Sequence, residues 1–112
     1  MTTTSKENKT SLSYDDLVDY IRAKWGIDTT DEISVYTGIS QYQVLEIVLK
    51  ENIKTKFRMT GLKFWEKYEV DFITNHSFEL TTGKAAEILL RSRYAVYMKA
   101  KSLGLSSMIK GK

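Results

Sequence analysis

The sequence contains no cysteine, only one histidine, and no apolar run of the roughly 20 residues that a membrane span needs. Without cysteine, the chain can form neither disulfides nor thiolate metal sites. His76 has no second histidine or cysteine with which to build a metal site or a nucleophile pair. A glycine-rich phosphate loop is also absent. We therefore expect no enzyme activity, no cofactor or metal, and no membrane partner.

The composition is that of a small globular protein. The 112 residues are 42% hydrophobic and 28% charged, which fits one compact domain. Residues 1–11 are polar, contain no apolar signal segment, and are expected to form a flexible N-terminal tail. Together with the absence of cysteine, this predicts a cytoplasmic protein.

Charge is distributed unevenly along the chain. Residues 1–52 contain five Lys or Arg and nine Asp or Glu, a net of −4, whereas residues 53–112 contain twelve and five, a net of +7. A basic half beside an acidic half indicates a partner with negative charge on one face. The alternative is an ordinary solvated surface with uneven charge.

The chain repeats itself with an offset of 52 residues. Residues 17–53 align without a gap on residues 69–105, and eight of the 37 positions are identical. Because the turn signals stay in register, we expect two copies of one unit of three helices flanked by extended segments. The identical pairs are Val18/Val70, Asp19/Asp71, Ile21/Ile73, Thr29/Thr81, Thr30/Thr82, Ser40/Ser92, Tyr42/Tyr94 and Val44/Val96.

Helix starts and ends are marked in both copies. Ser13 followed by acidic residues is typical of a helix start, and Ser40 can cap a later helix. Gly38 and Gly104 stand where left-handed turns are expected after helices. The expected helices run from about residue 13 to 26, 30 to 37 and 40 to 50 in the first copy, and over 66–76, 82–90 and 92–103 in the second.

The link between the copies predicts strands. From Ile53 to Met59, apolar side chains alternate with basic ones, and this period of two is typical of a strand with one basic face. A turn at Thr60-Gly61 is expected to return the chain antiparallel over 62–65, and residues 106–110 can add another strand.

The predicted fold class is therefore mainly α with a small central antiparallel β-sheet. A first helix-turn-helix repeat with its following strand is expected at 12–60, and a second at 61–112. The two pseudo-twofold, winged-helix-like units are expected to share one core, because about 40 residues bury too little surface alone. The expected core residues at the centre are Phe57, Phe64, Trp65 and Ile109.

Both repeats carry the spacing of a helix-turn-helix. Such a motif needs a small residue where its second helix crosses the third, a tight turn, and an apolar residue ten positions after the small one. The pattern resembles the general bacterial helix-turn-helix at these positions, except that leucine replaces glycine at the second turn. The residues are Ser34, Gly38 and Val44 in the first repeat and Ala86, Leu90 and Val96 in the second.

The third helix of the second repeat is the stronger candidate for reading DNA. Arg93 can contact guanine bidentately in the major groove, whereas Arg91, Lys99 and Lys101 are expected at phosphates. Tyr94 and Tyr97 either touch thymine methyls and phosphates or pack partly against the preceding helix. Ser92 stands at the entrance of this helix.

The third helix of the first repeat is expected to read more weakly. Gln41 or Gln43 can pair with adenine. Leu45 and Leu49 are expected to form an apolar stripe on its exposed face, which indicates either weak reading or a protein contact. The other candidate DNA-binding residues are Ser40 and Tyr42 here, and Lys54, Lys56 and Arg58 on the basic strand, which acts as a wing or is a solvated sheet face.

Two resemblances accompany this pattern. RSRYAVYMKAKSLGL (91–105) and WEKYEVDFI (65–73) resemble parts of Myb-like and related phage or plasmid helix-turn-helix domains. The duplicated units with strands between them, over residues 12–110, resemble TraN-like internal-dimer proteins of Gram-positive conjugative plasmid transfer regions. That resemblance implies double-stranded DNA near a transfer origin as ligand, relaxase or other transfer proteins as partners, and a monomer acting as a pseudo-dimer.

Two functions remain in view from the sequence. The first is sequence-specific binding of double-stranded DNA, in a transfer-accessory or transfer-operon regulatory role. The second is a protein–protein adaptor that uses the same scaffold without DNA. A steep fall of affinity with salt favours the first, because phosphate contacts release counterions.

Overall fold

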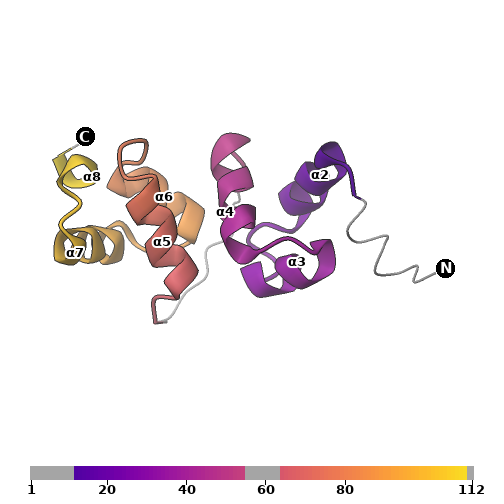
Figure 1. Ribbon diagram of the computed structural model, residues 1–112, viewed down its shortest axis with the longest axis horizontal. Coiled ribbons are helices and arrows are strands. Elements are labelled where there is room, and N and C mark those ends of the chain that lie inside the picture. Colours follow the sequence, from indigo (N-terminus) through magenta and orange to yellow (C-terminus); the bar gives the residue numbers. More distant parts are fainter. Residues whose placement is uncertain (1–11, 55–63, 111–112) are drawn as a thin grey trace. The chain divides into compact units, whose positions relative to one another are not determined.

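Helices account for every regular element among the residues that the computed structural model describes, which are 12–54 and 64–110 (Figure 1). The chain divides into two compact units, residues 1–57 and 58–112, which we call unit 1 and unit 2. Unit 1 contains α2 (Tyr14–Lys24), α3 (Thr30–Thr37) and α4 (Gln41–Lys50). Unit 2 contains α5 (Lys67–Asn75), α6 (Thr82–Leu89), α7 (Arg93–Leu103) and α8 (Ser106–Lys110).

Capping side chains fix where the helices of unit 1 begin. The hydroxyls of Ser13, Thr29 and Ser40 accept hydrogen bonds from backbone N–H groups three residues ahead, at the starts of α2, α3 and α4. Glu32 and Gln43 complete capping boxes for α3 and α4 by accepting from the cap residue's own N–H. Each cap satisfies amides that the helix itself leaves unpaired, worth about 1 kcal/mol each. The predicted helix starts in this unit are therefore close to the observed ones.

Unit 2 repeats the second and third caps at the 52-residue offset. Thr81 and Ser92 cap α6 and α7 as Thr29 and Ser40 cap α3 and α4. The positive-φ residue after the third helix also recurs, as Asn52 (φ 53°) in unit 1 and Gly104 (φ 74°) in unit 2. The internal repeat is thus visible in backbone conformation as well as in sequence.

Each unit has its own apolar core, built from the same repeat positions. In unit 1, α2 packs on α3 and α4, and α3 packs on α4; in unit 2, α7 packs on α6 and α8. Burying an isoleucine or valine side chain contributes about 1.5–3 kcal/mol, so these positions dominate the stability of each unit. Four equivalent pairs are fully buried: Ile21/Ile73, Ile33/Ala85, Val44/Val96 and Val48/Ala100.

The predicted antiparallel sheet is wrong. Among residues 12–54 and 64–110 no strand forms, and extended pairing is limited to one bridge between Trp25 and Asp28. Residues 106–110 form α8, since Gly104 turns the chain and Leu105 accepts backbone hydrogen bonds from Met108 and Ile109. Met108 is buried, so a one-turn helix with an apolar side replaces the expected strand.

The remaining residues of the predicted sheet are either described and not in a strand, or outside the described part of the chain. Ile53 is buried without strand pairing, and its N–H donates to the carbonyl of Val48 at the end of α4. Phe64 is 93% exposed and so belongs to no core. Residues 55–63, with Phe57 and the Thr60-Gly61 turn, lie outside the described residues.

No helix within the described ranges is long and apolar enough to cross a membrane. The same part of the chain holds no group of three or more histidine, aspartate or glutamate side chains that is placed to bind a metal ion.

Candidate nucleic-acid interface

The α6–α7 turn has the backbone conformation of the α3–α4 turn. Gly38 lies in the left-handed region at φ 83°, ψ 5°, and its N–H donates to the carbonyl of Ser34. Leu90 lies in the same region at φ 57°, ψ 43°, and its N–H donates to the carbonyl of Ala86. The leucine at this turn therefore preserves the geometry that glycine gives in unit 1. Burial of Leu90 to 8% exposure offsets the strain that a left-handed leucine carries.

The small residue predicted at the crossing of α3 and α4 has a further role. The Ser34 hydroxyl donates to the carbonyl of Ile39 at 2.6 Å, which closes the turn that leads into α4. Val44 and Val96, predicted to pack back on the preceding helix, are both fully buried. Both units are thus compatible with the predicted helix–turn–helix spacing.

The predicted reading face of α7 is open to solvent. Arg93 and Lys101 are exposed, Tyr94 is 71% exposed and Tyr97 is 37% exposed. Ser92 is also exposed and caps the helix. Tyr94 is therefore not packed into the core, and Tyr97 is only partly covered. Two cations and two phenols line one side of this helix, a mixture suited to phosphates and base edges.

Arg93 extends over the first turn of α6. A Cβ built on Gly83 would lie 3.2 Å from Nη2 and 3.3 Å from Nε of the Arg93 guanidinium. Gly83, Ala86, Glu87 and Arg93 line a shallow pocket at this place. The absence of a side chain at Gly83 therefore leaves room for the exposed guanidinium beside the first turn of α6.

The matching face of α4 is largely covered, contrary to the predicted apolar stripe. Leu45 is 1% exposed, and Leu49 is half-buried. Gln41 and Tyr42 are half-buried, whereas Ser40 and Gln43 are exposed. The expectation that Leu45 and Leu49 project together into solvent is wrong, because Leu45 belongs to the buried apolar set. Its counterpart in unit 2 is the surface residue Tyr97.

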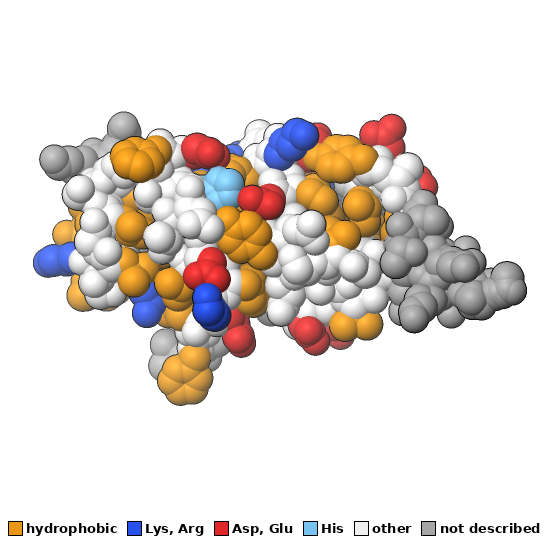
Figure 2. Space-filling view, in the orientation of Figure 1, with side chains coloured by type: hydrophobic (Ala, Val, Ile, Leu, Met, Phe, Trp, Pro, Cys, Tyr) orange, Lys and Arg blue, Asp and Glu red, His pale blue; other side chains and the backbone are white. Residues whose placement is uncertain are grey.

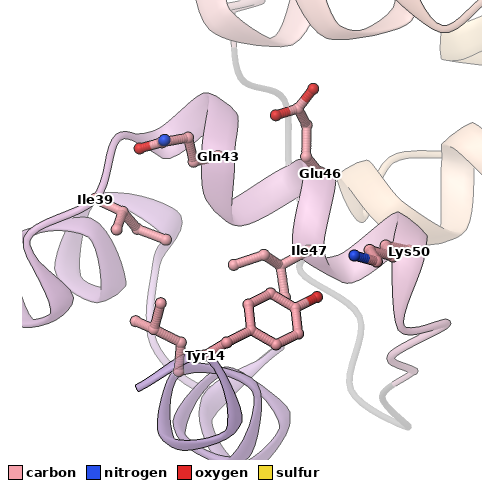
Figure 3. A pocket seen from close by; sticks show the side chains of 7 residues that line it. Tyr14, Ile39, Gln43, Glu46, Ile47 and Lys50 are labelled. Carbon is pink, nitrogen blue, oxygen red and sulfur yellow. The ribbon is translucent and has the colours of Figure 1, made fainter. Parts of the chain in front are cut away.

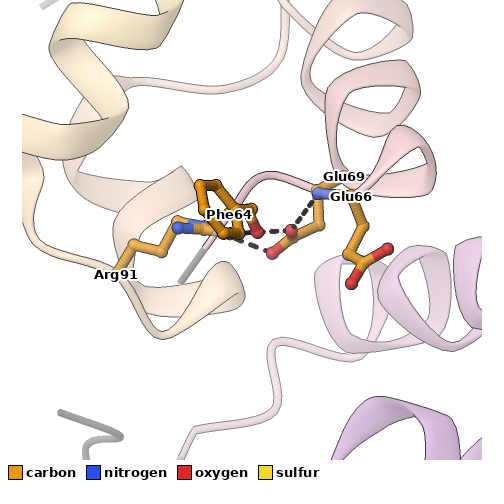
Figure 4. A network of polar contacts seen from close by, with 4 residues as sticks. All are labelled: Phe64, Glu66, Glu69 and Arg91. Atoms are coloured by element: carbon orange, nitrogen blue, oxygen red, sulfur yellow. Dashed lines mark hydrogen bonds and ion pairs between the residues drawn. The ribbon is translucent and has the colours of Figure 1, made fainter. Parts of the chain in front are cut away.

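Arg91, predicted at a phosphate, is buried instead (Figure 4). Its Nη2 donates to Oε1 of Glu69 at 2.8 Å, and its Nε donates to Oε2 at 3.2 Å. Nη2 also donates to the carbonyl of Phe64 at 3.0 Å. The side chains of Arg91 and Glu69 are 7% and 2% exposed. This arginine therefore joins the turn before α7 to α5 and is not on the exposed face.

Trp65 extends this cluster and was not predicted as part of it. The Arg91 guanidinium carbon lies 4.1 Å from the Trp65 ring centroid, and the Lys99 ammonium lies 5.6 Å from it. Both distances are within the range of cation–π attraction. Lys99 is consequently half-buried and faces the indole, while Lys101 faces solvent.

A sequence signal for the buried pair existed. At the 52-residue offset, Glu69 aligns with Leu17 and Arg91 aligns with Ile39. Two apolar positions that become oppositely charged together indicate an ion pair that replaces an apolar contact.

The remaining predicted site residues are the basic ones of the link. Lys54 is exposed and directly follows the buried Ile53. Lys56 and Arg58 lie outside the described residues. Apolar side chains also reach the surface of both units (Figure 2). The exposed ones include Val35, Tyr36, Phe64 and Phe78.

Comparison with protein-family models, with curated proteins and with solved structures finds no match for this chain.

Proposed function

We propose that the protein binds double-stranded DNA in a sequence-dependent manner, with α7 of unit 2 as its principal reading helix. The observation that carries this proposal is the exposed face of α7. A tight turn joins α6 to α7, and Ser92 caps the start of α7. The exposed residues on this face are Arg93, Tyr94, Tyr97 and Lys101. Residues at the start of the third helix are those that reach base edges in helix-turn-helix complexes.

The position of Arg93 supports base reading. Its guanidinium lies over Gly83, at the start of the exposed face of α7. An arginine that is bidentate to guanine O6 and N7 contributes about 1–3 kcal/mol of base discrimination. Lys101, about two turns further along α7, is suited to a phosphate, which adds affinity without sequence information.

The two units are proposed to be unequal readers. Unit 1 offers Ser40 and Gln43 at its surface, but the side of α4 that matches the α7 reading face is covered at Leu45. The acidic excess of residues 1–52 weakens phosphate binding there, whereas residues 53–112 are basic. Unit 2 therefore supplies most of the affinity.

The finer role follows from the family resemblance drawn from sequence. We propose a cytoplasmic accessory or regulatory protein of conjugative DNA transfer, with a site near a transfer origin or a transfer promoter. The imperfect repeat predicts an imperfect inverted repeat in the DNA site.

A binding-site selection from random duplexes, followed by fluorescence anisotropy on the selected duplex, tests the proposal. Arg93→Ala should lower affinity about tenfold or more and relax preference at one base position. Gln41→Ala should change affinity much less. Arg22→Ala, an exposed arginine on α2, is the matched control and should leave affinity unchanged apart from long-range charge effects.

The salt dependence of the same titration separates DNA binding from an adaptor role. Affinity should fall steeply between about 50 and 200 mM salt, since released counterions drive phosphate contacts. A selection that enriches no sequence, or equal losses from Arg93→Ala and Arg22→Ala, would contradict the proposal.

A further inference from the structure

Unit 1 has an open groove between α2 and α4, with the α3–α4 turn at one end, which we call the unit 1 groove (Figure 3). Figure 3 shows the side chains of Tyr14, Ile39 and Ile47 converging on one space. The cavity measures about 330 Å³, near the lower end of the roughly 300–1,000 Å³ of small-molecule sites. It therefore suits one large side chain better than an extended ligand. Its lining residues are Tyr14, Leu17, Ile39, Gln43, Glu46, Ile47 and Lys50.

The second repeat shows what lies at this place when it is filled. Ile39 corresponds to Arg91, and Ile47 corresponds to Lys99. In unit 2 the indole of Trp65 lies against both of these cations, at 4.1 and 5.6 Å. The surface that is a groove in unit 1 is therefore covered by a tryptophan in unit 2.

Unit 1 has no indole of its own for this position. The residue that aligns with Trp65 is Ser13, which is exposed and caps α2. Leu17, which aligns with Glu69, lines the groove with Ile39 and Ile47. The floor in unit 1 is thus apolar where unit 2 has charges, and an aromatic ring gains more from burial on such a floor.

Two contacts orient the side chains at the rim of the groove. The Tyr14 hydroxyl donates to Oε2 of Glu51 at 2.6 Å, which orients the ring at the edge of the groove. The Lys50 ammonium lies 5.1 Å from the Tyr14 ring centroid and is exposed. It offers an incoming ring the same kind of cation that Arg91 and Lys99 offer to Trp65.

We propose that the unit 1 groove binds a tryptophan side chain presented by an extended segment of a partner protein. Unit 2 indicates what the occupant is. There, residues 64–66 precede α5 without regular structure and place Trp65 over the equivalent surface. The indole lies on Leu17, Ile39 and Ile47 and faces Lys50. This binding site is separate from the α7 reading face and does not depend on the proposed DNA function.

A synthetic peptide of this chain's own sequence, Leu62-Lys-Phe-Trp-Glu-Lys67, is the test ligand. It is titrated into the full 112-residue protein labelled with ¹⁵N, and amide shifts are followed by NMR. Shifts that saturate and are confined to the residues lining the groove are expected. The same peptide with Trp65→Ala should bind about tenfold more weakly, because the indole supplies most of the binding contact. At equal concentration it should therefore shift these amides less.

Variants of the protein locate the site. Tyr14→Ala and Ile39→Ala should each weaken peptide binding about fivefold or more, since both remove lining side chains. Tyr36→Ala is the matched control, because Tyr36 is an exposed tyrosine of unit 1 that does not line the groove, and it should bind as the parent does. The amide spectrum of each variant reports folding, so a lost fold is distinguished from a lost site.

Four outcomes would overturn the proposal. They are no saturable shift at millimolar peptide, equal binding of the Trp65→Ala peptide, shifts centred on α7, and dissociation of a self-associated form by Tyr14→Ala. The last would assign the groove to a second copy of this chain. DNA affinity measured in parallel should be unaffected by Tyr14→Ala and Ile39→Ala, so the two proposals fail independently.

Discussion

Glu69 and Arg91 form a buried, two-point ion pair at the repeat positions that Leu17 and Ile39 occupy in unit 1. The two units therefore solve one packing problem in two ways. In unit 1, Leu17 and Ile39 line an apolar groove. In unit 2, Glu69 neutralises Arg91, and the guanidinium also contacts the Phe64 carbonyl and the Trp65 ring. Glu69 also accepts the backbone N–H of Glu66, so the pair orders the start of α5.

Exchange of this pair for its unit 1 equivalent should reveal strong coupling. Glu69→Leu or Arg91→Ile alone should each lower the free energy of unfolding by about 3–5 kcal/mol, because each leaves an unpaired buried charge. The double variant should be more stable than either single variant, since an apolar pair of similar volume replaces the charges. Urea unfolding followed by circular dichroism measures all three.

The Lys67–Asp71 pair of the same unit is the control. Its ammonium and carboxylate are 2.9 Å apart, close to the 2.8 Å of the Arg91–Glu69 pair, but the side chains are 86% and 44% exposed. Lys67→Ala should therefore change stability by no more than about 0.5 kcal/mol. Additive losses at Glu69 and Arg91, with no gain in the double variant, would show that the two side chains act separately.

Gly104 offers a test of backbone conformation without side-chain contacts. A Cβ at Gly104 would meet no atom within 4 Å, so only its φ of 74° resists substitution. Gly104→Ala should lower the free energy of unfolding by about 1–2 kcal/mol, the cost of the left-handed region for an ordinary residue. Gly104→Asn should lose less than half of that, because asparagine adopts this region more readily and stands at the equivalent position 52. Equal losses for alanine and asparagine would contradict the backbone explanation.

Gly83→Ala should change the position of the Arg93 side chain without destabilising unit 2. Alanine favours a helix by about 1 kcal/mol over glycine, so unfolding should become no easier. The new Cβ would approach the Arg93 guanidinium to 3.2 Å, and this flexible side chain would move away. If Arg93 reads a base from its present position, affinity for the selected duplex should fall about threefold to tenfold. Thermal unfolding and anisotropy on one preparation give both quantities; unchanged affinity would mean that Arg93 binds DNA from another position.

The helices were predictable because their signals are local. Serine and threonine caps at Ser13, Thr29 and Ser40, and the glycine turn at Gly38, act within three or four residues. Two of these signals recur at an offset of 52, as Thr81 and Ser92, and the gapless register around them predicted the helices of the second unit with nearly the observed bounds. At the α6–α7 turn, the alignment of Leu90 with Gly38 predicted the left-handed conformation better than the residue type did.

The sheet and part of the site were not predictable from the same signals. A short run such as SSMIK fits a strand or a helix, and the turn at Gly104 with the burial of Met108 decides for a helix. The face of α4 was misassigned because the burial of Leu45 depends on tertiary packing. Arg91 was assigned to DNA because its partner, Glu69, lies 22 residues earlier in the chain, beyond the range of local patterns.

Tyr14 should ionise at a higher pH than an ordinary tyrosine, and one substitution can remove the interaction that raises its pKa. Its hydrogen bond to Glu51 is the main cause that raises the Tyr14 pKa above 10.0, followed by burial and the charges of Glu51 and Asp15. Since the folded pKa lies above the unfolded one, the stabilisation is fully present below about pH 10 and is lost as pH rises through the folded pKa. Glu51→Gln should move the Tyr14 pKa down towards its ordinary value, measured by NMR of the tyrosine ring carbons. The Tyr20 pKa, raised mainly by burial and by Asp28, should stay where it is. A Tyr14 midpoint that does not move in Glu51→Gln would show that the hydrogen bond does not hold this wall of the unit 1 groove in solution.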